Sequence, residues 1–552
     1  MTRRCSARCF VIALICVGVP CASGQADIEE SISAPLGLLA EWTSAGGLNK
    51  PPTIFTQKAM STDLTANGLS RRHGSFLTTF GKPHEQAPRL KATTALRKWT
   101  STHSGAVSLK PISFDRHDSR NITTLIRVEV SGQSGKTLLY EVSHWQVGWQ
   151  RPSKDVEDRA WRISRITRQS TERVTTRGTA FVDRTASVMG DLVDAPDIAL
   201  GSEYWFGRID NLGEPHLMGH QGIAIGDLNG DGLEDVYVAM GTGLPNRLLI
   251  RQPDGTVVDR ADDAGVAWLD DTKGVLIVDT DNDGDRDLVT AVGNTIVLAK
   301  NDGAARFENF VRMKAPTSAP FYGLSAADFD GDGDLDLYGV RYIEQDYGVS
   351  IPLPFHDANN GPSNHLMRNE GDDRFADVTI AVGLDQNNRR FSLVGAWADY
   401  DNDGDADLYV ANDFGRNNLY LNDGGRFTDV AASMGIEDQA AGMGASWSDF
   451  DADGDLDLYV TNMYSAAGRR IAYQPEFQTD VDASQRSAIR GYSLGNSLFV
   501  NDASGFVERG DQAGVRMGRW GWGGIFVDWD NDSQDDLVLP NGFVSGALDD
   551  DL

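Results

Sequence analysis

A nine-residue acidic pattern that occurs six times constrains this chain of 552 residues more than any other feature. In the copy DYDNDGDAD, which begins at Asp399, carboxylates stand at positions 1, 3, 5, 7 and 9, and Gly404 stands at position 6. The other copies are DLNGDGLED from Asp227, DTDNDGDRD from Asp279, DFDGDGDLD from Asp328, DFDADGDLD from Asp449 and DWDNDSQDD from Asp528. Their starts are separated by 52, 49, 71, 50 and 79 residues, so the pattern marks a long internal repeat.

Each acidic copy lies between two short apolar runs. The fourth copy follows VGAWA and precedes LYVAN, and a third run with a turn comes next, in NNLYLNDGGRF from Asn417. Several short strands in a repeat of about fifty residues predict the blades of a β-propeller and not the coils of a solenoid. The sequence therefore predicts a mainly β protein, with a propeller of six to seven four-stranded blades and a small α+β domain before it.

The chemistry of the acidic pattern indicates a hard cation. Ca²⁺ takes six to eight oxygen ligands, and alternate acidic side chains on a tightly curled loop supply them. The glycine at position 6 permits the sharp bend. An EF-hand requires a glutamate at position 12, but the fourth copy has Ala411 there, inside an apolar run. The loop is therefore EF-hand-like for nine residues and then becomes a β-strand.

These repeats resemble the FG-GAP/VCBS repeats of integrin α-subunit-type propellers, in which a calcium loop joins the first two strands of a blade. Residues 179–552, about two-thirds of the chain, are similar to the cartilage-acidic-protein family of exported propeller proteins. The resemblance implies a propeller over this range, and the six copies of the loop make it specific. Phe181–Thr185 (FVDRT) resembles the outermost strand of a blade, so we expect it to complete the last blade and close the ring.

We expect side chains at positions 1, 3, 5 and 9 to bind Ca²⁺, together with the backbone carbonyl of position 7 and water. Five to six ions are expected, and the sixth loop, in which Ser533 replaces the glycine, is expected to be the weakest. The predicted ligands, loop by loop, are Asp227, Asn229, Asp231 and Asp235; Asp279, Asp281, Asp283 and Asp287; Asp328, Asp330, Asp332 and Asp336; Asp399, Asp401, Asp403 and Asp407; Asp449, Asp451, Asp453 and Asp457; and Asp528, Asp530, Asp532 and Asp536.

Charge is distributed very unevenly along the chain. Residues 50–185 carry 23 Lys and Arg against 11 Asp and Glu, whereas residues 186–552 carry 24 against 65. Of those 65 acids, 27 stand at odd positions of the six acidic copies. The odd positions of the six acidic loops therefore account for about two-fifths of this acidity. Nucleic acid is an improbable partner for so acidic a main domain.

The first 24 residues have the form of a secretory signal peptide. Arg3, Arg4 and Arg8 precede the apolar run from Phe10 to Val19, which is too short to span a bilayer. All four cysteines lie within the first 21 residues, so cleavage after Gly24 or Ala26 leaves no cysteine. The alternative is a lipoprotein acylated at Cys21. We expect a secreted, periplasmic or cell-surface protein without a transmembrane segment, stabilised by calcium instead of disulfides.

Residues 25–63 are expected to be a linker or irregular segment, with a short helix around Leu36 to Thr43. Residues 64–178 are expected to form the α+β domain. LKATTALRKWTST has helical spacing, and ITTLIRVEVSG, KTLLYEVSHWQVGWQ and RAWRISRITRQSTERV read as three long strands. Helices before long antiparallel strands resemble a SnoaL-like cone. His144, on one strand, points into such a cone or is an ordinary half-buried histidine.

Two functions fit these features. The first is a non-catalytic exported module for binding or adhesion, whose partner is an extracellular protein or polysaccharide. The alternative is an extracellular enzyme, either polysaccharide lyase-like on the propeller, where loops carry His216, His220, His356 and His365, or acting on small molecules in the cone. The long insertion from Met463 to Asn496 is the candidate partner-binding surface, with a packing insertion as the alternative. Its aromatic and basic residues are Tyr473, Phe477, Tyr492, Arg469, Arg470, Arg486 and Arg490.

Overall fold

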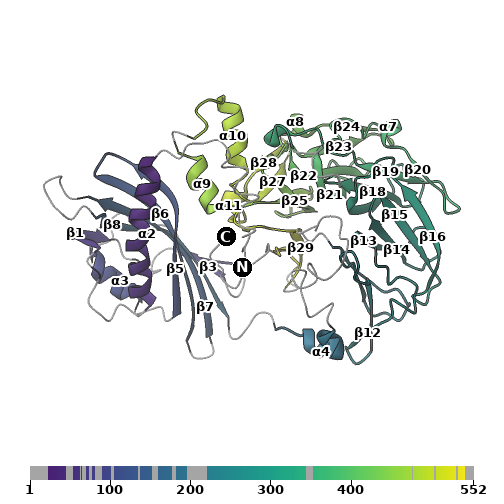
Figure 1. Cartoon of the computed structure of the whole chain (residues 1–552), viewed down its shortest axis with the longest axis horizontal. Helices are drawn as coiled ribbons and strands as arrows, with labels where there is room; N and C mark the ends of the chain where they lie inside the picture. Colours follow the sequence, from purple (N-terminus) through teal and green to yellow (C-terminus); the bar gives the residue numbers. More distant parts are fainter. Residues whose placement is uncertain are drawn as a thin grey trace, which may run out of the picture. The chain divides into compact units, whose positions relative to one another are not determined.

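The computed structural model divides the chain into two compact units (Figure 1). The first unit consists of residues 1–182 and 466–482, and the second of residues 183–465 and 483–552. The structure describes Pro52, Leu64 and residues 23–44, 54–61, 70–73, 77–80, 90–100, 105–134, 137–151, 160–176, 182–195, 221–343, 352–474, 477–502, 505–529 and 533–540. Among these residues, no helix is both long and apolar enough to cross a membrane. The predicted signal peptide lies outside them, apart from Ser23 and Gly24.

One large sheet organises the first unit, and all its strand pairs are antiparallel except β1 with β8, which run parallel. Its strand order is β2-β3-β8-β7-β6-β5, with β1 paired to β4 and β8. The strands are β1 (Phe55–Ser61), β2 (Ser70–His73), β3 (Leu77–Phe80), β4 (Leu90–Lys91), β5 (Gly105–Arg116), β6 (Asn121–Ser134), β7 (Thr137–Gln150) and β8 (Arg162–Thr176). Helix α2 (Ser23–Ser44) lies across this sheet, and α3 (Ala92–Thr100) and α9 (Ala466–Ala472) complete the unit (Figure 1).

The three long strands predicted from the sequence are β6, β7 and β8, and the predicted helix is α3. Their apolar residues alternate or recur at helical spacing and form one continuous core. Trp99 of α3 and Trp145 of β7 meet edge to face there, with ring centroids 4.9 Å apart. Strand β5 was not predicted, because Pro111 interrupts its apolar pattern. It lies at the edge of the sheet, where a missing N–H is tolerated.

The prediction that residues 25–63 are irregular is wrong. Residues Ser23–Ser44 form helix α2, and the expected short helix around Leu36 is only its second half. Ile32, Leu36 and Leu39 recur at helical spacing and are at most 3% exposed, so they bury one face of α2 in the core. Strand β1 adds Ala59 to the same core. The segment is therefore part of the first unit and not a linker.

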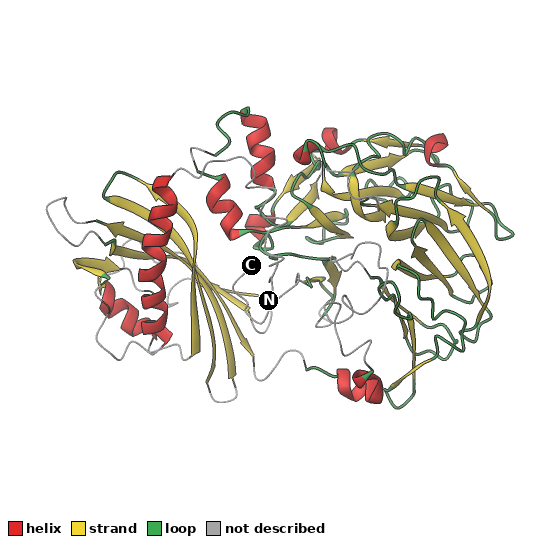
Figure 2. Cartoon of the chain, viewed as in Figure 1, coloured by secondary structure: helices red, strands yellow, loops and turns green. Residues whose placement is uncertain are grey.

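The second unit is built from five four-stranded antiparallel sheets and one two-stranded sheet, which follow one another along the chain (Figure 2). Its mainly β character confirms that part of the prediction. Sheet I contains β9 (Ile223–Gly226), β10 (Asp235–Val238), β11 (Arg247–Arg251) and β12 (Val257–Asp259). Sheet II contains β13 (Thr272–Val278), β14 (Asp287–Val292), β15 (Thr295–Asn301) and β16 (Phe307–Lys314). Sheet III contains β17 (Phe321–Ala327), β18 (Asp336–Arg341), β19 (His365–Asn369) and β20 (Phe375–Asp377).

The remaining sheets repeat this plan. Sheet IV contains β21 (Phe391–Ala398), β22 (Asp407–Phe414), β23 (Asn418–Asn422) and β24 (Phe427–Asp429). Sheet V contains β25 (Gly442–Ser448), β26 (Asp457–Asn462), β27 (Ser497–Asp502) and β28 (Gly505–Glu508), and sheet VI contains β29 (Ile525–Val527) and β30 (Asp536–Val538). The helical segments are α4 (Thr185–Met189), η1 (Gly190–Asp194), η2 (Phe355–Asp357), α7 (Thr379–Val382), α8 (Ala431–Met434), α10 (Ala483–Gly491) and α11 (Gly510–Ala513).

Successive sheets pack face to face through small separate cores. The first strands of neighbouring sheets, β9, β13, β17, β21, β25 and β29, lie next to one another in that order. One core joins sheets I and II around Tyr237 and Leu288, another joins sheets III and IV around Tyr338 and Leu408, and a third joins sheets IV and V around Tyr409. Each of these three cores takes residues from two sheets, and a further core around Tyr322, Phe391 and Met443 joins sheets III, IV and V, so every one of these sheets is stabilised by its neighbours.

The expectation that Phe181–Thr185 forms an outermost strand is not met in the described residues. Val182, Asp183 and Arg184 form no strand there, and Thr185 begins helix α4. What FVDRT shares with the end of an outermost strand, such as FADVT in sheet III, is a local turn. Asp183 accepts the N–H of Thr185, as Asp377 accepts the N–H of Thr379. This turn bond fixes the start of a helix and does not require a neighbouring strand.

Candidate metal centres

The six acidic loops occupy the same place in every sheet, between its first and second strands. Position 9 is the first residue of the second strand in all six sheets, as Asp407 is the first residue of β22. Position 2 follows the first strand closely, and its N–H donates back to the carboxylate of position 9. The sheets therefore hold both ends of each loop at a fixed separation.

The aspartate at position 1 curls the loop. In the fourth loop, Oδ2 of Asp399 accepts a hydrogen bond from the N–H of Gly404 and Oδ1 accepts one from Asp403, both at 3.0 Å. Gly404 has a φ of +99°, which an L side chain opposes. The bond from position 6 to position 1 recurs in the other five loops at 2.8–3.1 Å. In the sixth loop, Ser533 makes it at a φ of +68°, a conformation in which its side chain is strained.

The aspartate at position 9 joins the loop to the sheet. Asp407 is fully buried, its Oδ1 accepts the N–H of Asn422 (2.8 Å) and its Oδ2 accepts the N–H of Tyr400 (3.2 Å). The same two bonds occur in the other four-stranded sheets, at Asp235, Asp287, Asp336 and Asp457. Position 9 therefore has a structural role in addition to any role as a ligand.

The structure gathers the predicted ligands of four loops. Carboxylate oxygens of positions 1, 3 and 5 lie within 4.8 Å of one another in the second, third and fifth loops, and those of positions 1, 3 and 9 do so in the fourth. In the described part of the chain, no such group forms in the first loop, where the Asn229 amide donates to Asp231 (3.2 Å). Asp530 and Asp532 of the sixth loop lie outside the described residues.

The buried carboxylate of position 9 lies near the more exposed carboxylates of its loop, and their negative charges repel one another. Burial raises the pKa of Asp407 to about 7. Two backbone hydrogen bonds oppose this rise in pKa, and the charges of Asp401 and Asp403 add to it. Burial raises the pKa of Asp336 to about 7 in the same way. Burial and the charge of Asp403 raise the pKa of Asp401. A cation among these groups would relieve both effects.

One oxygen in the second loop tests whether these residues fit a cation. Oδ1 of Asp279 is buried and has no hydrogen-bond partner, although Oδ2 of the same carboxylate accepts the N–H of Gly284 at 3.0 Å. A buried carboxylate oxygen without a donor is costly, and a cation would satisfy it. All predicted side-chain ligands offer oxygen atoms to a metal ion, which suits Ca²⁺ or Mg²⁺ and not a soft metal.

In sheets II to V, an asparagine in the third strand forms a link to the acidic loop of the preceding sheet. The amide of Asn422 in β23 donates to the carbonyl of Phe329, at position 2 of the third loop (2.8 Å), and to that of Ala406 in its own loop (3.1 Å). The equivalent bonds run from Asn301 to Leu228 (2.8 Å), from Asn369 to Thr280 (2.9 Å) and from Asn501 to Tyr400 (3.2 Å). The five loops of sheets I to V are therefore connected in series.

These asparagines were not predicted from the sequence. The signal was present, because an asparagine precedes the turn at the same place in LAKNDG, LMRNEG, LYLNDG and LFVNDA. The backbone N–H of each is also the donor to position 9. The loop and the third strand, taken together as one repeating unit, would have indicated them.

Other candidate residues have structural surroundings. His365, the first residue of β19, is 5% exposed. Its Nδ1 forms a hydrogen bond with the carboxylate of Asp377, the last residue of β20 (2.8 Å). Of the aromatic residues proposed as a partner-binding surface, Phe477 and Tyr492 are 4% and 5% exposed, and only Tyr473 is exposed. The insertion therefore uses two of its aromatic residues for packing. His216 and His220 lie outside the described residues.

Comparisons with known proteins match the repeats. Residues 227–290, 279–339 and 399–460 match the FG-GAP-like repeat family. Cartilage acidic protein 1 of Xenopus tropicalis is 29% identical over 214 residues, which cover 36% of this chain and 30% of that protein. The proteins of the same name from Mus musculus and Homo sapiens are 27% and 26% identical, and each match covers 35% of this chain and 28% of the relative. The chain thus spans less than a third of the length of these relatives.

One similar solved structure is that of an Agrocybe aegerita lectin, described for its specific recognition of non-reducing terminal N-acetylglucosamine. The match covers 58% of this chain and 75% of the lectin chain. The sequence identity is 17% and the TM-score is 0.35, so the two structures are only weakly similar. The family match lies within residues 227–460, and the SnoaL-like resemblance of the first unit stays a prediction. The chain carries FG-GAP-like repeats and is related to cartilage acidic protein 1 over about a third of its length.

Proposed function

We propose that the second unit is a Ca²⁺-stabilised β-propeller of an exported protein that binds an extracellular protein or a glycan. The sheets are its blades, six to seven in number. Two observations support this arrangement: the first strands of successive sheets are neighbours, and the small cores join successive sheets. Both are features of blades arranged around a common axis.

The observation that carries the proposal is the connection between loops. A cation held by Asp399 and Asp401 orders the fourth loop, and the Tyr400 carbonyl of that loop accepts the amide of Asn501 in sheet V. Binding in one loop therefore stabilises the junction with the next sheet. Five to six Ca²⁺ ions would act in this way, each as a structural ion and not as a sensor.

The proposal includes export of the protein from the cell. Extracellular calcium modules bind at roughly 10⁻⁴ to 10⁻³ M, concentrations at which a secreted protein is kept loaded. Residues 1–24 would be the signal peptide, the first unit would extend from α2 through β8, and residues 179–552 would contain the propeller. Relatedness to cartilage acidic protein 1 supports a module of the adhesion type.

Metal analysis of the purified mature protein tests the calcium claim. We expect five to six Ca²⁺ per chain after dialysis against about 1 mM Ca²⁺, and Mg²⁺ should not replace them. One Ca²⁺ or fewer per chain would overturn it. The binding claim needs a separate measurement, in which the loaded protein is tested on a glycan array and a panel of matrix proteins. Binding to neither class by fully loaded protein would contradict that half of the proposal.

A further inference from the structure

One position in the third strand distinguishes the acidic loops from one another. It is the residue just before the one whose backbone N–H donates to the carboxylate of position 9. The strand register aligns this residue across the five four-stranded sheets. An apolar side chain occupies it in sheets I, IV and V, whereas a cation occupies it in sheets II and III. The five residues are Ile250, Lys300, Arg368, Leu421 and Val500.

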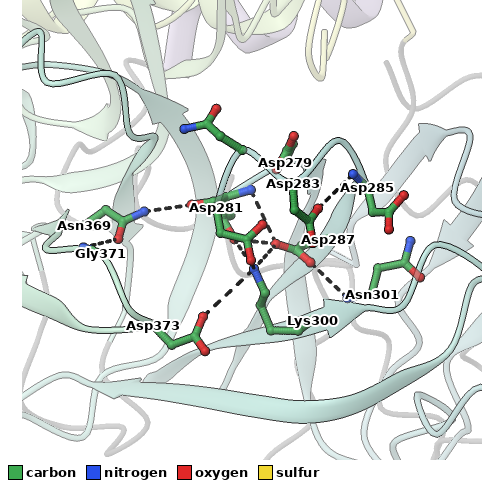
Figure 3. A network of polar contacts seen from close by, with 12 residues as sticks. Asp279, Asp281, Asp283, Asp285, Asp287, Lys300, Asn301, Asn369, Gly371 and Asp373 are labelled. Carbon is green, nitrogen blue, oxygen red and sulfur yellow. Dashed lines mark hydrogen bonds and ion pairs between the residues drawn. The ribbon is translucent and has the colours of Figure 1, made fainter.

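Lys300 directs its ammonium group into the second loop (Figure 3). Its Nζ forms an ion pair with Asp281 and lies 3.0 Å from Oδ2 of Asp287, which are positions 3 and 9. Asp373 of the following sheet lies 4.0 Å away, and Oγ1 of Thr280 lies 3.5 Å away. The Lys300 side chain is 11% exposed. Two of the four predicted calcium ligands therefore already have a positive partner.

The fourth loop is the natural comparison. Leu421 occupies the equivalent position, and among the described residues no Lys or Arg forms an ion pair with Asp399, Asp401 or Asp407. In the third loop, Arg368 lies 3.9 Å from Asp330 but is bonded more closely to Glu370. Arg368 is therefore a weaker version of Lys300.

We propose that Lys300 is a built-in cation of the second loop, which competes with Ca²⁺ for Asp281 and Asp287 and makes this loop the weakest calcium site of the second to fifth loops. This inference rests on the proposed function, in which the loops bind calcium. Ca²⁺ must withdraw two carboxylates from a poorly hydrated ammonium, and an uncompensated buried charge is costly. Affinity in such loops also follows the number of free ligand charges. The free oxygen of Asp279 remains available, so binding is weakened and not abolished.

The lysine has a consequence for stability. With its carboxylates neutralised, the second loop keeps its shape and its link from Thr280 to Asn369 (2.9 Å) without calcium. The fourth loop lacks such a substitute and depends on the ion. The junction of sheets II and III should therefore stay intact at calcium concentrations so low that the junction of sheets IV and V opens.

Isothermal titration with Ca²⁺ of the full mature chain tests the inference through three variants. K300L copies the fourth loop into the second, L421K does the reverse, and K314L removes the same charge from an exposed site on β16 as the control. We expect K300L to tighten the site in the second loop, the weakest of the second to fifth loops, by about tenfold or more, L421K to remove one strong site, and K314L to match the wild type.

The outcomes separate the two claims. Calcium binding by the wild type that K300L leaves unchanged in number and affinity would overturn the role of Lys300 and leave the proposed function intact. No calcium binding by any protein would overturn both. Because Leu421 is partly buried, L421K is scored only if a thermal melt shows that it folds, and K300M serves as the second variant for the lysine.

Discussion

The two units of this protein are stabilised in different ways. The first has one continuous core, in which residues of α2, α3 and the large sheet all belong to a single cluster. The second has several small cores, each shared by two or three successive sheets, and a series of polar links between acidic loops. A single core resists local change as a whole, whereas a series is only as stable as its junctions.

Removal of calcium should have the largest effect and should affect only the second unit. A site held at about 100 times its dissociation constant adds about 2.7 kcal/mol, so two or more sites contribute over about 5 kcal/mol to the free energy of unfolding. We expect scanning calorimetry to show two transitions, of which excess chelator lowers one and leaves the other unchanged. A chelator that shifts both transitions equally, or neither, would break the contrast between the units.

The first unit should respond to a cavity instead. Trp145 is 1% exposed and packs against Trp99, so Trp145→Ala should destabilise this unit by about 3–5 kcal/mol. The calcium affinity of the chain should stay the same, since the described residues of this core all belong to the first unit. Tyr140→Ala is the matched control on the same strand, because Tyr140 is 40% exposed and should cost less than about 0.5 kcal/mol. A loss of calcium binding in Trp145→Ala would show that the two units are not independent.

The same contrast explains what the sequence could predict. Acidic positions and the glycine at position 6 act locally, so the loops and their place between two strands were readable from DYDNDGDAD and the apolar runs on either side of it. Helix α2 was half missed because Pro35 stands inside it and the residues before Ile32 are largely polar, which obscures the helical pattern. Its assignment to the core depends on contacts with distant strands, which periodicity does not show.

Residues whose role depends on a partner far along the chain were also missed. Nothing about Lys300 itself indicates that its ammonium group reaches Asp281, since only the pairing of β14 and β15 brings them together. Phe477 and Tyr492 look like surface aromatics in a long polar insertion, yet both are buried. Composition indicates what a segment is able to bind, but burial is decided by the fold.

The polar links between loops should have the smallest effect. Asn422 is fully buried, and its amide is the donor to Phe329 in the loop of the preceding sheet. Asn422→Ala leaves that carbonyl without its donor, which should cost about 1–3 kcal/mol in the second unit and nothing in the first. Asn501→Ala should cost less, because its bond to Tyr400 is longer, at 3.2 Å against 2.8 Å. Asn309→Ala, at an exposed position of β16, is the control. Denaturant unfolding in saturating calcium measures all three, and equal losses for Asn422 and Asn309 would mean that the loops are not connected in series.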